Sequence, residues 1–159
     1  MIVRHGRHLT ASRLTALLQR HGVNAPALAF GSLDAYLRGF IDLLYEHGGR
    51  FYVLDWKSNH LGDSQADYGQ ASMAKAMDEH NYHLQYLLYT VAVHRYLQQR
   101  IAGYQYEQHF GGVQYLFVRG VRPEWIDAEG RACGIFAARP TLQFIEQLSA
   151  LIGAHEVSA

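Results

Sequence analysis

The 159-residue sequence predicts a single α/β domain in which a small sheet is flanked by helices. Two runs rich in aromatic and branched residues, 40–45 and 51–56, surround the turn-forming segment 46–49 and predict a β-hairpin. Apolar side chains at helical spacing over residues 82–100 predict a long, largely buried helix. Residues 113–118 predict a central strand that pairs with the hairpin.

Shorter patterns predict the remaining elements. Gly22 follows a helical leucine pattern, and clusters of glycine and polar residues mark the loops. In chain order we expect a helix over 9–20, a loop over 23–33, a first hairpin strand that begins near Tyr36, a loop over 59–67, a helix over 67–79, a break at 80–81, a polar loop over 123–131, an edge strand over 134–138 and a closing helix over 141–152.

Composition limits the function classes. The 14 Lys and Arg residues balance the 14 Asp and Glu residues, so phosphate binding would have to come from local patches. A single cysteine, Cys133, excludes an internal disulfide and is expected to be a small buried residue. The ten histidines lack a zinc-binding spacing. No apolar run approaches the length of a membrane span or signal peptide, so we expect a cytoplasmic protein.

Asp42, Asp55 and Lys57 are the candidate catalytic residues of the hairpin. If the loop closes on residues 47–48, Asp42 lies opposite Val53, on the face that also carries Asp55 and Lys57. Asp42 is then diagonal to Asp55 at about 7–8 Å, close enough for two carboxylates to share an ion. An odd-length loop would instead turn Asp42 to the other face.

An acid two residues before a lysine has two interpretations. The pair can be an ordinary surface contact at a strand end, which contributes little to stability. Alternatively, two carboxylates bind a hard divalent cation while the lysine stabilises developing negative charge or orients a water. The second acid, Asp42, stands on the other strand and favours the metal site.

Two further pairs have open interpretations. Gln85 and Tyr89 lie one turn apart on the same helical face, either as a core pair or as contacts to a phosphate or to water at the acidic face. Arg119 and Arg122 follow the central strand, either as solvated loop charges or as contacts to a DNA backbone.

Three segments together resemble a known family. They read GFIDLLYEHGGRFYVLDWKSNHLG, AMDEHNYHLQYLLYTVAVHRYL and HFGGVQYLFVRGV. They are similar to the C-terminal nuclease domain of the RecB subunit of exonuclease V, the RecBCD helicase–nuclease. The resemblance runs from about Leu9 to the end of the chain and is densest over 39–121. It implies a restriction-endonuclease-like PD-(D/E)XK core, a mixed central sheet flanked by helices, that cleaves DNA with magnesium.

The resemblance also implies roles for particular residues. Asp42 and Asp55 correspond to the two metal-binding aspartates, and the backbone carbonyl of Trp56 would also bind the ion. Lys57 corresponds to the catalytic lysine. Gln85 and Tyr89 match a Q-x-x-x-Y motif, which favours their functional interpretation. Within the one domain, 1–35 would be an N-terminal helix and loop, 36–122 the catalytic core, and 123–159 a C-terminal loop, edge strand and helix.

Three departures from the family pattern bear on the function. An upstream helix with a metal-proximal histidine and a further acid is absent, and His5 and His8 match neither context. No ATPase motif is present. His83 stands where a relative can carry Asp. We therefore expect an N-terminally truncated nuclease domain that works with DNA, a helicase and other subunits. The alternatives are a catalytically weak fragment for DNA binding or protein docking, and a stand-alone restriction-type nuclease.

Overall fold

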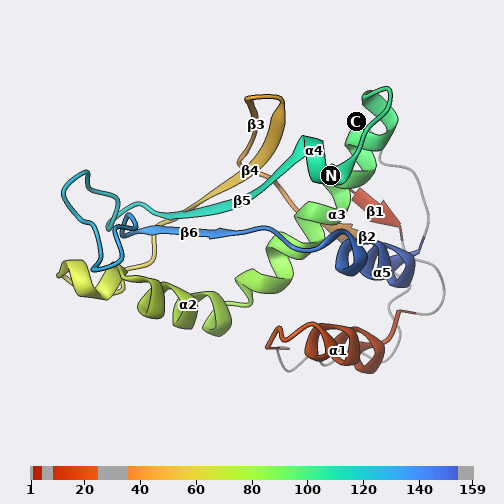
Figure 1. Ribbon diagram of the computed structural model, residues 1–159. Coiled ribbons are helices and arrows are strands. Elements are labelled where there is room, and N and C mark those ends of the chain that lie inside the picture. Colours follow the sequence, from red (N-terminus) through yellow and green to blue (C-terminus); the bar gives the residue numbers. More distant parts are fainter. Residues whose placement is uncertain (1, 5–8, 25–35, 154–159) are drawn as a thin grey trace.

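The computed structural model describes residues 2–4, 9–24 and 36–153, and it confirms the α/β architecture (Figure 1). A mixed four-stranded sheet with the order β3-β4-β5-β6 lies above a layer of helices. The elements of this core are β3 (Leu43–His47), β4 (Arg50–Lys57), β5 (Phe110–Phe117), β6 (Ile135–Ala138), α1 (Ala11–Arg20), α2 (Gln70–Glu79), α3 (Tyr82–Arg100), α4 (Tyr106–His109) and α5 (Leu142–Ile152).

The hairpin is confirmed, but its loop lies one residue further along than predicted. Gly48 and Gly49 form the two-residue turn, and both have positive φ, as the tightest right-twisted hairpin turns require. Leu44 therefore lies opposite Val53, where Asp42 had been predicted. Because the loop keeps an even length, every side chain stays on its predicted face.

The first hairpin strand begins later than predicted. Tyr36–Arg38 forms a separate strand, β2, which pairs antiparallel with β1 (Ile2–Arg4) in a two-stranded sheet. The chain then passes through residues 39–42 before β3 begins at Leu43. The predicted loop over 23–33 falls largely outside the described residues, as do His5 and His8.

The predicted central strand is confirmed. β5 pairs parallel with β4 on one side and antiparallel with β6 on the other. β6 is the predicted edge strand, and the closing helix α5 follows with Thr141 as its N-cap. The Thr141 hydroxyl accepts a 3.3 Å hydrogen bond from the Phe144 N–H, which satisfies a backbone donor at the helix start.

α3 has the predicted bounds, whereas the helix predicted over 67–79 is divided in two. A 3-10 turn over Gln65–Tyr68 ends at Gly69, and α2 begins at Gln70. The predicted break before α3 is confirmed, because Asn81 has a φ of 57°, the left-handed conformation. This residue lets the chain turn between α2 and α3 without an intervening loop.

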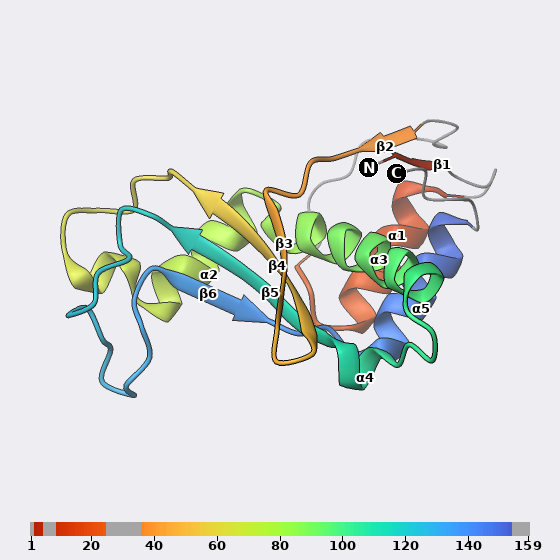
Figure 2. The same ribbon diagram turned by 90° about the horizontal axis from the view of Figure 1, so that it is seen from above.

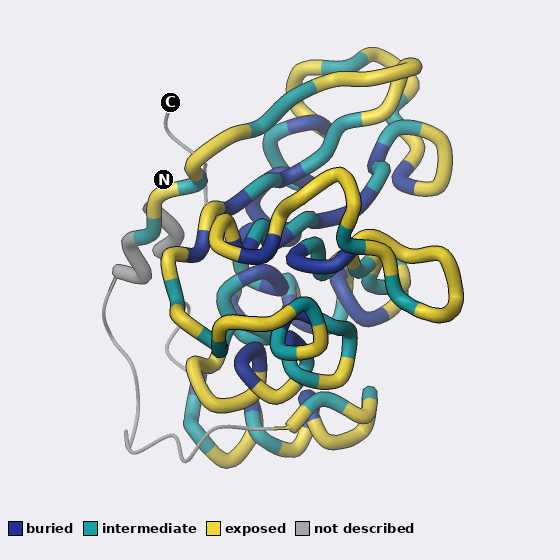
Figure 3. Tube along the Cα trace, turned by 90° about the vertical axis from the view of Figure 1, so that its left-hand side faces the viewer, coloured by how far each residue is buried: buried dark blue, intermediate teal, exposed yellow. Residues whose placement is uncertain are grey.

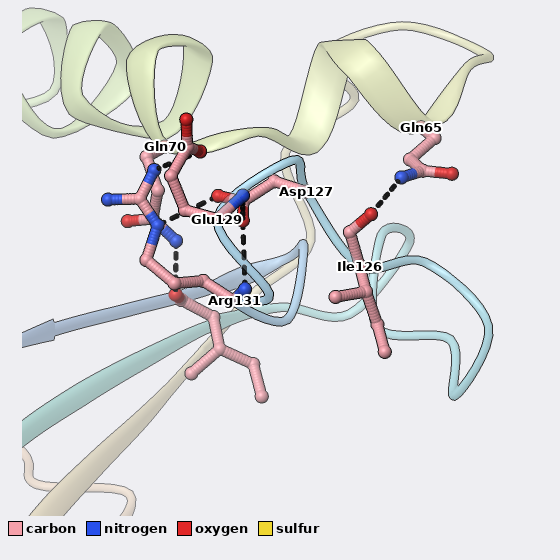
Figure 4. A network of polar contacts seen from close by, with 7 residues as sticks. Gln65, Gln70, Ile126, Asp127, Glu129 and Arg131 are labelled. Atoms are coloured by element: carbon pink, nitrogen blue, oxygen red, sulfur yellow. Dashed lines mark hydrogen bonds and ion pairs between the residues drawn. The ribbon is translucent and has the colours of Figure 1, made fainter.

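A polar network fastens the loop between β5 and β6 to the 3-10 turn (Figure 4). Gln65 Nε2 donates a 2.7 Å hydrogen bond to the Ile126 carbonyl. Within the loop, Arg131 donates 2.8 Å hydrogen bonds to the Asp127 carboxylate from both its backbone N–H and its Nε. The predicted polar surface loop is therefore an ordered structure that closes one end of the sheet.

The two faces of the sheet have different environments. Val53, Asp55 and Lys57 share the face that packs on the helices and are buried. Seen from above, the strands lie in front of α2 (Figure 2), and buried segments, in dark blue, lie inside the molecule (Figure 3). The opposite face carries Leu43 and Trp56, which are 38% and 48% exposed. Within the described ranges, none of the helices is both long and apolar enough to cross a membrane.

Candidate active site

β4 places the predicted acid and lysine on one face. Asp55 and Lys57 are two residues apart in a strand, so their side chains point the same way. Lys57 Nζ lies 2.6 Å from Asp55 Oδ2, and the side chains are only 9% and 5% exposed. The surface-contact interpretation is therefore wrong for this pair, because both charges are buried.

Asp42 directly precedes β3, the strand that neighbours β4. Leu43 pairs with Leu54 in the antiparallel hairpin, so the residue before Leu43 comes next to the residue after Leu54. Extended by one residue, this register sets Asp42 opposite Asp55 rather than diagonal to it, which corrects the predicted register. The negative charge of Asp42 contributes to raising the pKa of Asp55, as expected of two nearby carboxylates.

The backbone of Trp56 faces Asp42. The Trp56 N–H donates a 3.0 Å hydrogen bond to Asp42 Oδ2, whereas the carbonyl of the next residue, Lys57, accepts from the Val118 N–H on the β5 side. In a strand, the N–H and C=O of one residue point to the same side. The Trp56 carbonyl is therefore directed to the side on which Asp42 lies.

Gln85 joins the lysine to α3. Its Oε1 accepts a 2.9 Å hydrogen bond from Lys57 Nζ and a 3.0 Å hydrogen bond from the Tyr115 hydroxyl. Its Nε2 donates a 3.0 Å hydrogen bond to the Tyr89 hydroxyl. The core-pair interpretation of Gln85 and Tyr89 is therefore incomplete, because Gln85 contacts the lysine directly and Tyr89 contacts Gln85.

Tyr89 also holds the chain that leads to Asp42. Burial raises the pKa of the Tyr89 hydroxyl, while hydrogen bonds from Gln85 and from the backbone of Phe40 oppose that rise. A Cβ atom on Gly39 would lie 2.9 Å from Tyr89 Cε1, so this segment passes close against the ring. One tyrosine thus connects α3 to the strand that carries the second acid.

Electrostatics favour a cation at this place. Burial is the largest cause that raises the pKa of Asp55, with Asp42 adding to it, and the hydrogen bond and charge of Lys57 oppose the rise. A buried carboxylate next to a second carboxylate is stabilised when a positive charge comes close. Lys57 supplies one such charge, and a divalent ion would supply another.

The donor set fits a magnesium ion. In the described part of the chain, no group of three or more His, Cys, Asp or Glu side chains could hold a metal ion together. Magnesium, however, is commonly held by one or two carboxylates while it keeps several waters or substrate phosphate oxygens. Asp42, Asp55 and the Trp56 carbonyl offer this number and kind of oxygen ligands.

The structure adds two residues that sequence analysis missed. The Lys57 ammonium lies 3.9 Å from the ring centroid of Tyr82 and 4.8 Å from that of Tyr115. Tyr82 is three residues before Gln85 and seven before Tyr89, so helical spacing alone could have indicated it. Tyr115 lies beside Asp55 in the parallel register and required the sheet topology.

Three other predicted residues lie around the site rather than in it. Arg119 Nε donates a 3.0 Å hydrogen bond to the carbonyl of Ser58, directly after Lys57. Arg122 packs over the Trp125 ring, 4.5 Å from its centroid. His83 Nε2 lies 3.2 Å from the Asp78 carboxylate, so α2 provides its charged neighbour.

Comparisons with known proteins agree with this geometry. A sequence model described as the PD-(D/E)XK nuclease superfamily matches residues 2–150. The chain is 49% identical over 140 residues to the RecBCD enzyme subunit RecB of Escherichia coli strain K12, a match that covers 86% of this chain and 11% of that protein. It is 41% identical over 132 residues to the same subunit of Haemophilus influenzae, with coverages of 83% and 10%.

A more distant relative gives the same name. The chain is 40% identical over 128 residues to the RecBCD enzyme subunit RecB of Mycolicibacterium smegmatis, with coverages of 77% and 12%. The predicted resemblance to RecB is thus confirmed. The chain spans about a tenth of the length of the curated relatives it matches.

Proposed function

Because the chain belongs to the PD-(D/E)XK nuclease superfamily, we propose that it is a magnesium-dependent DNA nuclease domain of RecB type. It would hydrolyse phosphodiester bonds during repair and recombination at double-strand breaks. One observation carries the proposal above all. Asp42, directly before β3, accepts a 3.0 Å hydrogen bond from the backbone of Trp56, between the buried Asp55 and Lys57, whose Oδ2 and Nζ lie 2.6 Å apart.

The proposed roles follow from the contacts. Asp42, Asp55 and the Trp56 carbonyl would hold the ion, which when bound supplies Lewis-acid polarisation of the scissile phosphate and activation of water. Lys57 stabilises the negative charge that develops on the phosphate as the leaving oxygen departs. Gln85 fixes the ammonium, and Tyr89 fixes Gln85. Water is the nucleophile, so no side chain needs to form a covalent intermediate.

The proposal extends to partners and location. The relatives are named as subunits of the RecBCD enzyme. By analogy, we infer that this domain acts on DNA in the cytoplasm and cooperates with a helicase and with other subunits. The exposed Arg119 lies beside the site at the end of β4, where it would contact a DNA phosphate.

The experiment measures hydrolysis of end-labelled linear DNA by the purified chain, with and without magnesium. We expect metal-dependent cleavage that falls at least about 100-fold in Asp55→Ala and Lys57→Ala. Asp63→Ala and Lys75→Ala are the matched controls, because both side chains are exposed and pair only with surface neighbours. Both controls should retain activity.

Other outcomes would support the alternatives. DNA binding without hydrolysis in the wild-type chain would contradict the nuclease proposal and support a binding or docking module. Cleavage of circular DNA at defined sites would support a stand-alone restriction-type nuclease. Cleavage that survives in Asp55→Ala would show that the chemistry occurs elsewhere.

A further inference from the structure

The ammonium group of Lys57 is enclosed by two polar and two aromatic neighbours. Asp55 Oδ2 lies at 2.6 Å and Gln85 Oε1 at 2.9 Å. The ring centroids of Tyr82 and Tyr115 lie at 3.9 Å and 4.8 Å. We propose that Tyr82 is a positioning residue whose ring holds the Lys57 ammonium at the catalytic centre, an inference that rests on the proposed function.

Tyr82 is itself fixed at both ends. It is the first residue of α3, directly after the left-handed Asn81, so the turn between the helices sets its direction. Its hydroxyl donates a 3.1 Å hydrogen bond to Asn59 Oδ1, in the loop that leaves β4. The His80 ring stacks against it at 5.3 Å. The ring therefore cannot leave Lys57 without breaking these contacts.

The ring becomes important when Asp55 binds an ion. An ammonium has three N–H donors, of which Asp55 and Gln85 accept two. With an ion held by Asp55, Lys57 would share that carboxylate with a second positive charge, and its contact with Asp55 would weaken. Gln85 and the aromatic faces then hold the ammonium, since a cation is attracted to the face of a ring, most strongly where water is excluded.

The aromatic ring and the hydroxyl of Tyr82 have different roles, and two substitutions distinguish them. Tyr82→Phe keeps the aromatic face and loses only the contact with Asn59, so it should preserve the position of Lys57. Tyr82→Leu removes the aromatic face and should release the ammonium. Tyr115 is unsuitable for the test because it is fully buried in the core.

The chain offers an unusually clean readout, because Lys57 and Lys75 are its only lysines. Reductive methylation followed by peptide mass spectrometry gives the rate at Lys57 relative to Lys75, whose side chain is 76% exposed. We expect the ratio to be low in the wild type and in Tyr82→Phe, and to rise about 5-fold or more in Tyr82→Leu. An unchanged ratio in Tyr82→Leu would overturn the proposal.

Two controls distinguish release of the lysine from unfolding. Cys133 is the only cysteine and is 2% exposed, so its alkylation rate reports opening of the core. A rise at Lys57 with no rise at Cys133 supports the proposal, whereas a parallel rise at both shows a merely structural role and overturns it. Tyr96→Leu removes a half-buried tyrosine from the same helix and should leave the Lys57 ratio unchanged.

Nuclease kinetics provide the second arm. Tyr82→Leu should lower kcat about 10-fold or more with little change in KM for DNA, because the lysine acts on the transition state. Tyr82→Phe should recover most of kcat. A rise in KM with kcat unchanged would overturn the positioning role. If the wild-type chain cleaves no DNA, the proposed function fails, and the labelling ratio still decides whether Tyr82 holds Lys57.

Discussion

Asp42 Oδ2 accepts a 3.0 Å hydrogen bond from the backbone N–H of Trp56, the residue between Asp55 and Lys57. The acid that precedes β3 is thus attached to the backbone of β4, the strand that carries the other two candidate groups. This bond fixes the direction of the Asp42 side chain, and its donor is a backbone group of the site itself. The relative positions of the three groups therefore depend on the hairpin register.

We predict that Asp42→Asn and Asp42→Ala differ in stability but not in activity. Asn keeps an oxygen that can accept from Trp56 and loses the charge, whereas Ala loses both. Both variants should lose about 100-fold or more in metal-dependent cleavage. Only Ala should lower the free energy of unfolding, by about 1 kcal/mol, as measured by urea denaturation. Equal stability of the two variants would argue against the hydrogen bond.

We predict that Gln85→Leu is destabilising even without metal or DNA. Leucine is similar in size but leaves the Lys57 ammonium and the Tyr115 hydroxyl without their shared acceptor. An unsatisfied buried donor costs about 1–3 kcal/mol, and more when it is charged. Chemical denaturation measures the loss. The control is Gln99→Leu, at an exposed position of the same helix, which should change stability by less than about 0.5 kcal/mol.

We predict that Tyr89→Phe reduces cleavage by loosening the segment 39–41, which directly precedes Asp42. The change removes an oxygen that accepts from Gln85 and from the backbone of Phe40. Loss of a small part of the catalytic geometry lowers kcat by about 10-fold or more. Steady-state kinetics on linear DNA measure the effect. Tyr96→Phe, on the same helix, is the control and should retain wild-type kcat; a Tyr89→Phe enzyme as active as that control would contradict the role.

We predict that stability falls as the pH drops below about 6.5. Burial lowers the pKa of both His83 and His94 from the usual value. As the pH falls, these histidines therefore bind protons in the unfolded chain before they do so in the folded protein. Their contribution is therefore complete above the unfolded pKa and is lost as the pH falls toward the folded pKa. The measurement is the free energy of unfolding from about one pH unit above the ordinary histidine pKa to about 1.5 units below it.

His94→Gln isolates one of these groups. His94 is 5% exposed and faces the Tyr104 hydroxyl at 3.2 Å, the Tyr106 ring, the charge of Arg95, which lowers its pKa, and the charge of Glu146, which raises it. The variant should show a shallower fall in stability with acid. Parallel curves for the variant and the wild type would show that His94 does not carry this dependence.

Local patterns predicted most of the elements, because each one is decided within a short stretch. Apolar spacing gave α3 with its observed bounds, and the hairpin followed from two β-rich runs around a Gly-Gly pair. The turn was misplaced by one residue because His47-Gly48 and Gly48-Gly49 are both plausible turn pairs. The folded structure decides between the two turn pairs, because both Gly48 and Gly49 have a positive φ there.

The candidate site residues on one strand could be predicted more readily than those that different elements bring together. Asp55 and Lys57 share a face by strand geometry alone. Tyr115 joins the site only because β5 runs parallel to β4. Tyr82 shares the helical spacing of Gln85 and Tyr89, but its contact with the Lys57 ammonium depends on how α3 packs against the sheet. The β1–β2 pair was missed because three-residue strands leave no recognisable period.

The position of Trp56 gives the protein an intrinsic optical probe of its own site. The indole is half-exposed, the backbone N–H of the same residue binds Asp42, and the chain has only one other tryptophan, Trp125. In a Trp125→Phe background, all indole fluorescence would come from the residue between the acid and the lysine. Titration with calcium or magnesium could then follow occupancy directly, in the absence of DNA and of any turnover.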